Sequence, residues 1–133
     1  MADPRAVVAA AMETFNSRDV EAALALMHPD VVWSHERLDR VPEPIAYCGH
    51  GEVRRFWESY LDSFERFDLR AHEVRSGDNW VACRTVIVGV GKGSQAEVEA
   101  PPLVYVYEVE DDLITRVTAF PEMEDALAAA RSL

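Results

Sequence analysis

The sequence has 133 residues, 49% of them hydrophobic, and a formal net charge of −11 at pH 7. A chain of this length and composition is expected to fold as one domain over residues 1–133, with a core that needs neither disulfides nor metal. The acidic balance argues against nucleic acid and anionic membrane surfaces as partners, because both attract basic patches.

Cysteine usage and hydropathy indicate the compartment. The two cysteines, Cys48 and Cys83, form neither a CxxC pair nor a disulfide framework, so a reducing, cytoplasmic setting is expected. The chain has no charged start followed by an apolar stretch, and we therefore expect no signal peptide. No apolar run approaches the ~20 residues that a membrane span needs.

Two short helices are predicted at the start of the chain. Asp3 followed by Pro4 is typical of a helix start, and apolar residues then recur at helical spacing over residues 4–15. Asp19 can cap a second helix over residues 20–27. The break between the two is so short that it predicts a helical hairpin.

The apolar period changes after the second helix, where a proline is followed by Val31–Trp33. Proline ends a helix, and these three residues favour a strand over residues 31–36. The strand brings a titratable pair, His35 and Glu36, to the mouth of a loop. That loop, Arg37–Cys48, shows little periodicity, and loops of this length are typically functional lids or poorly ordered.

The clearest pattern in the chain predicts a third helix after Gly51. Apolar residues recur at i, i+3, i+4, i+7, i+8 and i+11, with charged residues on the opposite side. The apolar positions are Val53, Phe56, Trp57, Tyr60, Leu61 and Phe64. Such an aromatic stripe is usually core, and its inner end could also form the wall of a pocket.

From residue 67 the apolar period drops to two, which predicts strands joined by hairpins. The predicted strands are residues 67–76, 80–90, 98–109 and 113–120, followed by a closing helix over residues 122–131. Pro101 and Pro102 interrupt the third of these strands and indicate an edge or a bulge. The order of elements predicts an α+β fold, in which a cone-shaped, mostly antiparallel sheet curves around the third helix and leaves a pocket at its open end.

Several stretches resemble the nuclear-transport-factor-2-like superfamily. Residues 15–22 and 27–33 look like its helix-turn-helix-strand opening, and Gly49–Trp57 resembles the start of its third helix. Residues 114–120 and 123–127 are similar to the last strand and final helix of its SnoaL-like branch. The resemblance implies a cone-shaped α+β barrel that often forms a homodimer through the sheet. The superfamily includes ketosteroid isomerases, polyketide cyclases, epoxide hydrolases, dehydratases and binding domains, so the fold leaves the activity open.

The resemblance also implies positions for a site. The ketosteroid isomerases carry an aspartate base at the end of the first strand, and the matching residue here is His35. Their tyrosine on the first helix falls near Ala11, which has no hydroxyl, and their second acidic donor falls near Tyr105. The isomerase donor pair is therefore at most half present. For the Arg-Asp-Asp set of the epoxide hydrolases, the nearest available pairing is Arg84 with Glu99.

His35 is the leading catalytic candidate, because an imidazole titrates near neutral pH and can take and return a proton. Tyr105, Tyr107 or Tyr60 could donate a hydrogen bond to an enolate oxygen. The alternative is a histidine that only forms a hydrogen bond at a strand end. Neighbouring strand residues face opposite ways, so His35 and Glu36 should not both point inward.

The candidates for ligand binding are Trp33, Trp57, Tyr60, Phe64, Arg84 and Tyr107. Arg84 lies among apolar strand residues and needs a partner if it is buried, either an anionic ligand or an ion pair. Glu99 alternates with small apolar residues and is expected to be solvated. No metal site is expected, because His28, His50 and His72 lack metal-ligand spacing.

Two functions are compatible with the sequence. The first is a cofactor-independent isomerase, cyclase or hydrolase that removes a proton from a hydrophobic carbonyl compound, with His35 as the base and a tyrosine as the enolate donor. The second is a non-catalytic binder of a small apolar ligand, or an accessory subunit. No cofactor is expected in either case. The expected partners are a small hydrophobic molecule and a second copy of the chain.

Overall fold

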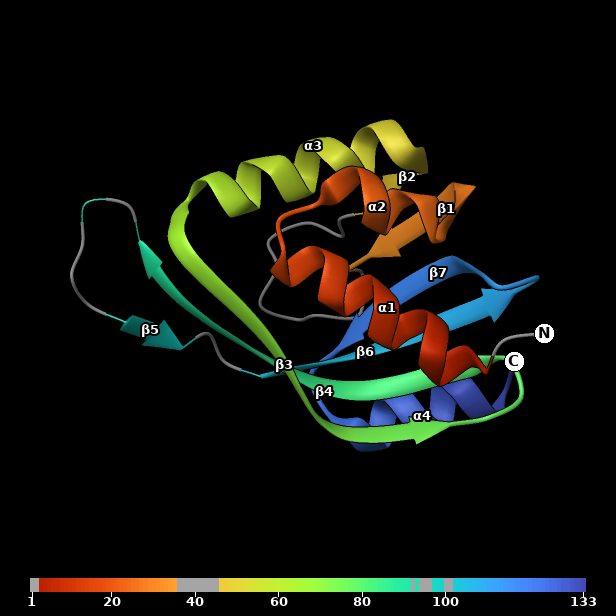
Figure 1. Cartoon of the computed structure of the whole chain (residues 1–133). Coiled ribbons are helices and arrows are strands. Elements are labelled where there is room, and N and C mark those ends of the chain that lie inside the picture. Colours follow the sequence, from red (N-terminus) through yellow and green to blue (C-terminus); the bar gives the residue numbers. More distant parts are fainter. Residues whose placement is uncertain (1–2, 36–45, 92, 94–96, 100–101) are drawn as a thin grey trace.

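The computed structural model describes residues 3–35, 46–91, 93, 97–99 and 102–133 (Figure 1). Its elements are α1 (Pro4–Asn16), α2 (Val20–Ala25), β1 (Met27–Ser34), β2 (Ala46–Cys48), α3 (Gly49–Asp62), β3 (Phe64–Ser76), β4 (Trp80–Gly91), β5 (Glu97–Glu99), β6 (Leu103–Glu110), β7 (Leu113–Phe120) and α4 (Met123–Arg131). The predicted α+β class is confirmed.

The strands form one curved sheet in the order β2-β1-β7-β6-β4-β3, and β5 also pairs with β4. The β1–β7 pair is parallel and the other pairs are antiparallel. The predicted cone of mostly antiparallel strands is therefore confirmed. In the described part of the chain β2 and β3 stand at the two ends of this order and do not pair with each other, so the sheet is open and does not close into a barrel.

The predicted helix starts are also confirmed. The Asp3 carboxylate accepts a hydrogen bond from the backbone N–H of Arg5 at 2.9 Å, and the Asp19 carboxylate accepts one from that of Ala22 at 3.1 Å. Arg18, with a φ of 60°, lies in the turn between α1 and α2 and donates to the Phe64 carbonyl at 2.7 Å. Arg18 also donates to the Leu61 carbonyl at 3.3 Å, so it ties this turn to the end of α3. None of the described helices is long and apolar enough to cross a bilayer.

Alternation along the strands gives the sheet a concave and a convex face. Helices α1, α2 and α3 cover the concave face, and α4 lies on the opposite side (Figure 1). The larger core lies between the first three helices and the concave face, where Leu24, Val53 and Ile114 are fully buried. A smaller core lies on the convex face, where Ala126 and Ala130 of α4 contact strands β4, β6 and β7.

The predicted element boundaries differ from the observed ones mainly where pairing between strands determines where a strand begins or ends. The predicted loop Arg37–Cys48 falls largely outside the described residues, but its last three residues form β2 and pair with the end of β1. The first strand begins at Met27, and its pairing with β7 shifts register between Met27 and Val32. Pro29 lies in that interval and has no N–H to donate to the ladder.

The predicted third helix and the strand at 98–109 are each divided differently. Helix α3 ends at Asp62, so Phe64 opens β3 and does not continue the helical stripe. The strand is split into β5 and β6, on either side of the prolines that predicted an interruption.

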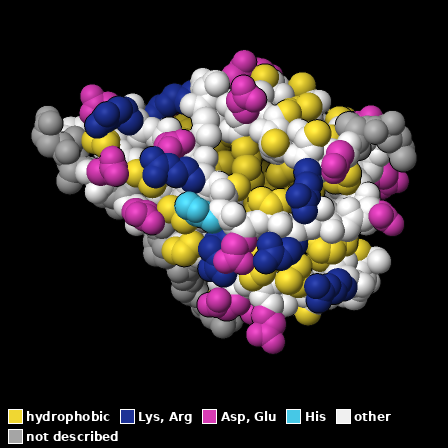
Figure 2. Space-filling model, turned by 60° about the horizontal axis from the view of Figure 1, so that its bottom comes forward, with side chains coloured by type: hydrophobic (Ala, Val, Ile, Leu, Met, Phe, Trp, Pro, Cys, Tyr) yellow, Lys and Arg dark blue, Asp and Glu magenta, His cyan; other side chains and the backbone are white. Residues whose placement is uncertain are grey.

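On the face shown in Figure 2, acidic and basic side chains are mixed around patches of hydrophobic surface.

Candidate functional site

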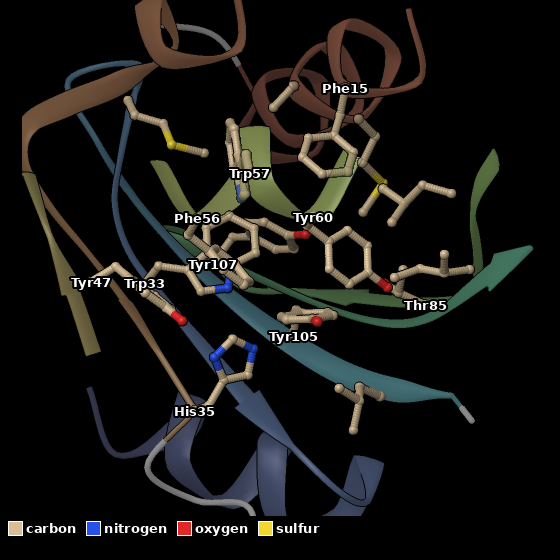
Figure 3. A pocket seen from close by; sticks show the side chains of 16 residues that line it. Phe15, Trp33, His35, Tyr47, Phe56, Trp57, Tyr60, Thr85, Tyr105 and Tyr107 are labelled. Atoms are coloured by element: carbon tan, nitrogen blue, oxygen red, sulfur yellow. The ribbon is translucent and has the colours of Figure 1, made fainter. Parts of the chain in front are cut away.

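A cavity of about 370 Å³ lies between the concave face of the sheet and helices α1 and α3 (Figure 3). This volume is in the range of small-molecule binding sites. Its sixteen lining residues are apolar, aromatic or hydroxyl-bearing apart from His35, and none of them is Asp, Glu, Lys or Arg. The cavity is therefore suited to a ligand that is largely apolar and uncharged.

Strand register places His35 beside Tyr105. Ser34 pairs with Thr118 of β7, and His35 is the next residue, so it lies level with Ala119. Ala119 in turn pairs with Tyr105 of β6. Three neighbouring strands thus bring the imidazole and the phenol to the same level of the concave face, with a small residue between them, and their ring centroids are 6.5 Å apart.

The environment of His35 is aromatic. Its ring makes edge contacts with Tyr47, Phe56 and Tyr105, at centroid distances of 6.5, 5.7 and 6.5 Å. Burial among these rings lowers the pKa of His35 below its usual 6.5. The imidazole is consequently neutral at neutral pH, which is the form that can accept a proton.

Two phenol groups of the cavity, those of Tyr60 and Tyr107, are held in their protonated form. Tyr105 and Tyr107 are 8% and 4% exposed. Burial raises the pKa of Tyr107 well above its usual value, and the neighbouring Cys83 and Tyr105 raise it further. Burial also raises the pKa of Tyr60. Tyr60 and Tyr107 are therefore hydrogen-bond donors throughout the neutral pH range.

Trp33 of β1 and Trp57 of α3 join the sheet to the helix that covers it. Their rings meet edge to face, with centroids 5.2 Å apart and planes at 88°. Both side chains are buried, and neither indole N–H has a hydrogen-bond partner within the described residues. Buried donors are normally paired, so the wall of the cavity holds two unused donors.

The structure brings six of the predicted site residues together around this cavity. They are Trp33, His35, Trp57, Tyr60, Tyr105 and Tyr107. Ala11 also lines the cavity, so at the place where the resemblance puts the isomerases' tyrosine α1 supplies a methyl group. Glu36, the other member of the titratable pair at the end of the first strand, lies outside the described residues.

Two predicted ligand-binding residues, Arg84 and Phe64, do not line the cavity. Thr85 faces the cavity, so its neighbour Arg84 faces the convex side, where its Nε donates to the Glu73 carboxylate at 3.2 Å. The nearest pairing expected for Arg84 was Glu99, and the structure gives Glu73. Phe64 instead packs its ring over the backbone of Gly89.

Sequence reasoning missed Thr85, Tyr47 and several apolar lining residues on α1 and the strands. Tyr47 lies in a stretch that was expected to be a loop. Thr85 could have been found by alternation, because an outward-facing arginine at 84 requires an inward-facing residue at 85.

The histidines considered for metal binding lie apart. His28 accepts a hydrogen bond from the Asp30 N–H at 3.0 Å, the His50 ring is 3.0 Å from the Met27 carbonyl, and His72 is exposed. Across the described ranges, no group of three or more His, Cys, Asp or Glu side chains could hold a metal ion.

Comparison with known proteins supports the resemblance read from the sequence. The family model of the SnoaL-like domain matches residues 8–117. No curated protein matches the chain. Among solved structures, a proposed polyketide cyclase from Xanthomonas campestris pv. campestris is 26% identical, with a TM-score of 0.71 and coverage of 95% of each chain.

Two further solved structures share the fold at lower identity. TerC, co-crystallised with polyporic acid, is 19% identical, with a TM-score of 0.72 and coverage of 96% of this chain and 97% of that one. RV0760c from Mycobacterium tuberculosis, in complex with estradiol-17beta-hemisuccinate, is 21% identical, with a TM-score of 0.76 and coverage of 93% and 97%.

Proposed function

The chain belongs to the SnoaL-like domain family, and from that premise we propose that its cavity binds a small hydrophobic carbonyl compound and that His35 removes a proton from a carbon next to the carbonyl. The activity would be that of a cofactor-independent isomerase or cyclase. The observation that carries the proposal is the position of His35 in the cavity wall, where its imidazole is neutral and can accept a proton. The other lining residues include no Asp, Glu, Lys or Arg and no second histidine.

The proposed reaction uses groups that already line the cavity. The C–H next to the carbonyl gives its proton to a ring nitrogen of His35, and the electrons of that bond move into the carbonyl to form an enolate. Tyr105, at the same level of the sheet, donates a hydrogen bond to the enolate oxygen. Return of the proton to another carbon gives an isomer. Attack of the enolate carbon on a second carbonyl of the same molecule closes a ring, and the alkoxide that forms takes the proton back from His35.

Two of the similar structures also bear on the kind of ligand. TerC and RV0760c were each solved with an organic ligand, polyporic acid in one and estradiol-17beta-hemisuccinate in the other. At 19% and 21% identity these proteins share the fold with our chain. The proposal for a carbonyl ligand therefore depends on the lining of this cavity.

A specific observation favours the second function, a non-catalytic binder. The contacts of His35 within the described residues are with aromatic rings, and no carboxylate lines the cavity to stabilise an imidazolium. A catalytic histidine is commonly oriented by a carboxylate or carbonyl. In a binder, His35 would only adjust the polarity of the cavity.

Proton exchange separates the two functions. The purified protein is first examined by native mass spectrometry for a retained apolar ligand. It is then incubated in D₂O with 1-tetralone, a two-ring ketone, from about pH 5 to 9, and exchange at the carbon next to the carbonyl is followed by NMR. We expect exchange in the wild type, a loss in His35→Gln and no change in His72→Gln, since His72 is exposed. Equal rates in wild type and His35→Gln would contradict catalysis.

A second copy of the chain is the other partner that we propose, bound through the convex face of the sheet. Helix α4 covers only part of this face. Glu108 and Arg116, 4.0 Å apart, lie on another part of it, so it offers both charged and apolar contacts. Sedimentation at micromolar concentration tests this proposal, and a monomer would contradict it.

A further inference from the structure

A second pair of hydroxyl groups lies in the same cavity, away from His35. Tyr60 reaches down from α3, and Thr85 points up from β4. Figure 3 shows the hydroxyl end of Tyr60 directed toward Thr85. The proposed proton transfer uses neither of them.

The hydrogen-bonding capacity of this pair is largely unused. Thr85 is 3% exposed, and the contact of its Oγ1 in the structure is with the sulfur of Cys83 at 3.7 Å, a weak partner. Tyr60 contacts the rings of Phe56, Phe64 and Phe67, but the described part of the chain gives its hydroxyl no hydrogen bond. Hydroxyl groups that line an apolar cavity without strong hydrogen-bond partners can select a ligand that supplies those partners.

The pair lies at a fixed separation from the His35 end. His35 follows β1 and Thr85 is in β4, with β7 and β6 between them. Three strand spacings correspond to roughly 14 Å between the backbones of β1 and β4, measured across the sheet. A hydrogen bond at each end takes about 3 Å, and the remaining span suits two or three fused rings better than one.

We infer that the ligand is a flat molecule of fused rings that carries a second oxygen, as a hydroxyl or keto group, at the end opposite its reactive carbonyl, and that Tyr60 and Thr85 bind this oxygen. A ligand hydroxyl can accept from the Tyr60 O–H and donate to Thr85 Oγ1, which satisfies all three groups. This inference rests on the proposed function, which places the carbonyl beside His35. Tyr60 and Thr85 thereby determine specificity and take no part in the proton transfer.

Calorimetric titration with two matched ketones tests the inference. 1-Tetralone has the carbonyl alone, and 6-hydroxy-1-tetralone adds a hydroxyl at the opposite end of the two rings. We expect wild type to bind the hydroxylated ketone more tightly by roughly fivefold, the effect of one additional net hydrogen bond. Tyr60→Phe and Thr85→Val should each bring the ratio close to one and leave the affinity for 1-tetralone within about twofold. Thr118→Val, on the convex face, is the matched control and should keep the wild-type ratio.

The outcomes separate this inference from the proposed function. Equal affinity for the two ketones in wild type, or a preference that persists in Tyr60→Phe and Thr85→Val, overturns the inference and leaves proton transfer by His35 standing. A hydroxyl preference that depends on Tyr60 and Thr85, without any His35-dependent exchange, supports the inference and contradicts catalysis. No binding of either ketone at millimolar concentration contradicts both. Circular dichroism confirms folding, and Tyr60→Phe still decides if Thr85→Val fails to fold.

Discussion

The imidazole of His35 and the phenol ring of Tyr105 cross at 80° with their centroids 6.5 Å apart. They come from strands that are not neighbours in the sheet, and β7 between them contributes only the methyl group of Ala119 at that level. A larger residue there would fill the space between base and donor. Because Ala119 is small, the imidazole of His35 and the hydroxyl group of Tyr105 can both reach the same part of a bound ligand.

Tyr105→Phe should lower the rate of ketone proton exchange by about 10²-fold, the usual cost of removing one donor to an enolate-type oxygen. Tyr107→Phe is the matched comparison, because Tyr107 lies level with Trp33 and not with His35. Its effect should be clearly smaller. NMR exchange rates at saturating ketone measure both, and a larger loss in Tyr107→Phe would assign the donor role to Tyr107.

The lowered pKa of His35 predicts a pH dependence of stability. Below pH 6.5 the unfolded chain binds a proton at this residue while the folded protein still holds it neutral, so the unfolded state binds more protons. The free energy of unfolding should therefore fall as the pH drops below 6.5, and level off once the lower pKa of the folded protein is passed.

Urea titrations of wild type and His35→Gln at a series of pH values isolate this effect, because contributions of other groups cancel in the difference. The advantage of His35→Gln should grow as the pH falls. His72→Gln, at an exposed position, should follow wild type. A difference between wild type and His35→Gln that does not change with pH would mean that burial leaves the His35 pKa unperturbed.

The two cysteines should differ in reactivity. Cys48 is exposed, whereas Cys83 is 1% exposed and its burial raises the thiol pKa to about 11. At pH 8 only about 0.1% of Cys83 is thiolate, the reactive form. A chromogenic aromatic disulfide should therefore titrate one thiol per native chain and two per denatured chain. Cys48→Ser should react only after denaturation, and rapid reaction of native Cys48→Ser would contradict the burial of Cys83.

Gly89→Ala should destabilise the protein by about 1–3 kcal/mol, because the added methyl group would meet the Phe64 ring. A Cβ at this position would lie 2.4 Å from Cδ1 of Phe64. Gly51→Ala is the control: nothing lies within 4 Å of its Cβ position, and this helical site should gain about 0.4–1 kcal/mol. Urea midpoints measure both, and Phe64→Leu in the Gly89→Ala background should recover part of the loss.

Local sequence signals were sufficient for the helices and for much of the cavity wall. Asp3 and Asp19 marked helix starts through capping chemistry, and the aromatic stripe of α3 supplied Trp57 and Tyr60. These features depend on residues close together in the chain, so periodicity was enough to find them. Tyr105 was placed by the resemblance, and its position beside His35 depends on a register that only the paired strands define.

The site residues that the sequence did not predict correctly depend on strand pairing and on which face of each strand points into the cavity. Arg84 and Thr85 are neighbours, and their roles would exchange with a shift of one residue. Tyr47 belongs to a strand of three residues that exists because it pairs with β1, and a strand that short has no period of its own. Phe64 continued the helical pattern in sequence, but the chain had already turned into β3.

The crossed indoles of Trp33 and Trp57 also make the cavity an optical reporter of its own contents. Two indoles held 5.2 Å apart at 88° couple their electronic transitions, which produces a signed near-ultraviolet circular dichroism signal. A ligand that lies against both rings alters that signal and their emission together. Trp80 lies outside this cavity, packed near Gly77, and provides a constant background. Ligands can thus be screened on the unlabelled protein by its own ultraviolet spectrum.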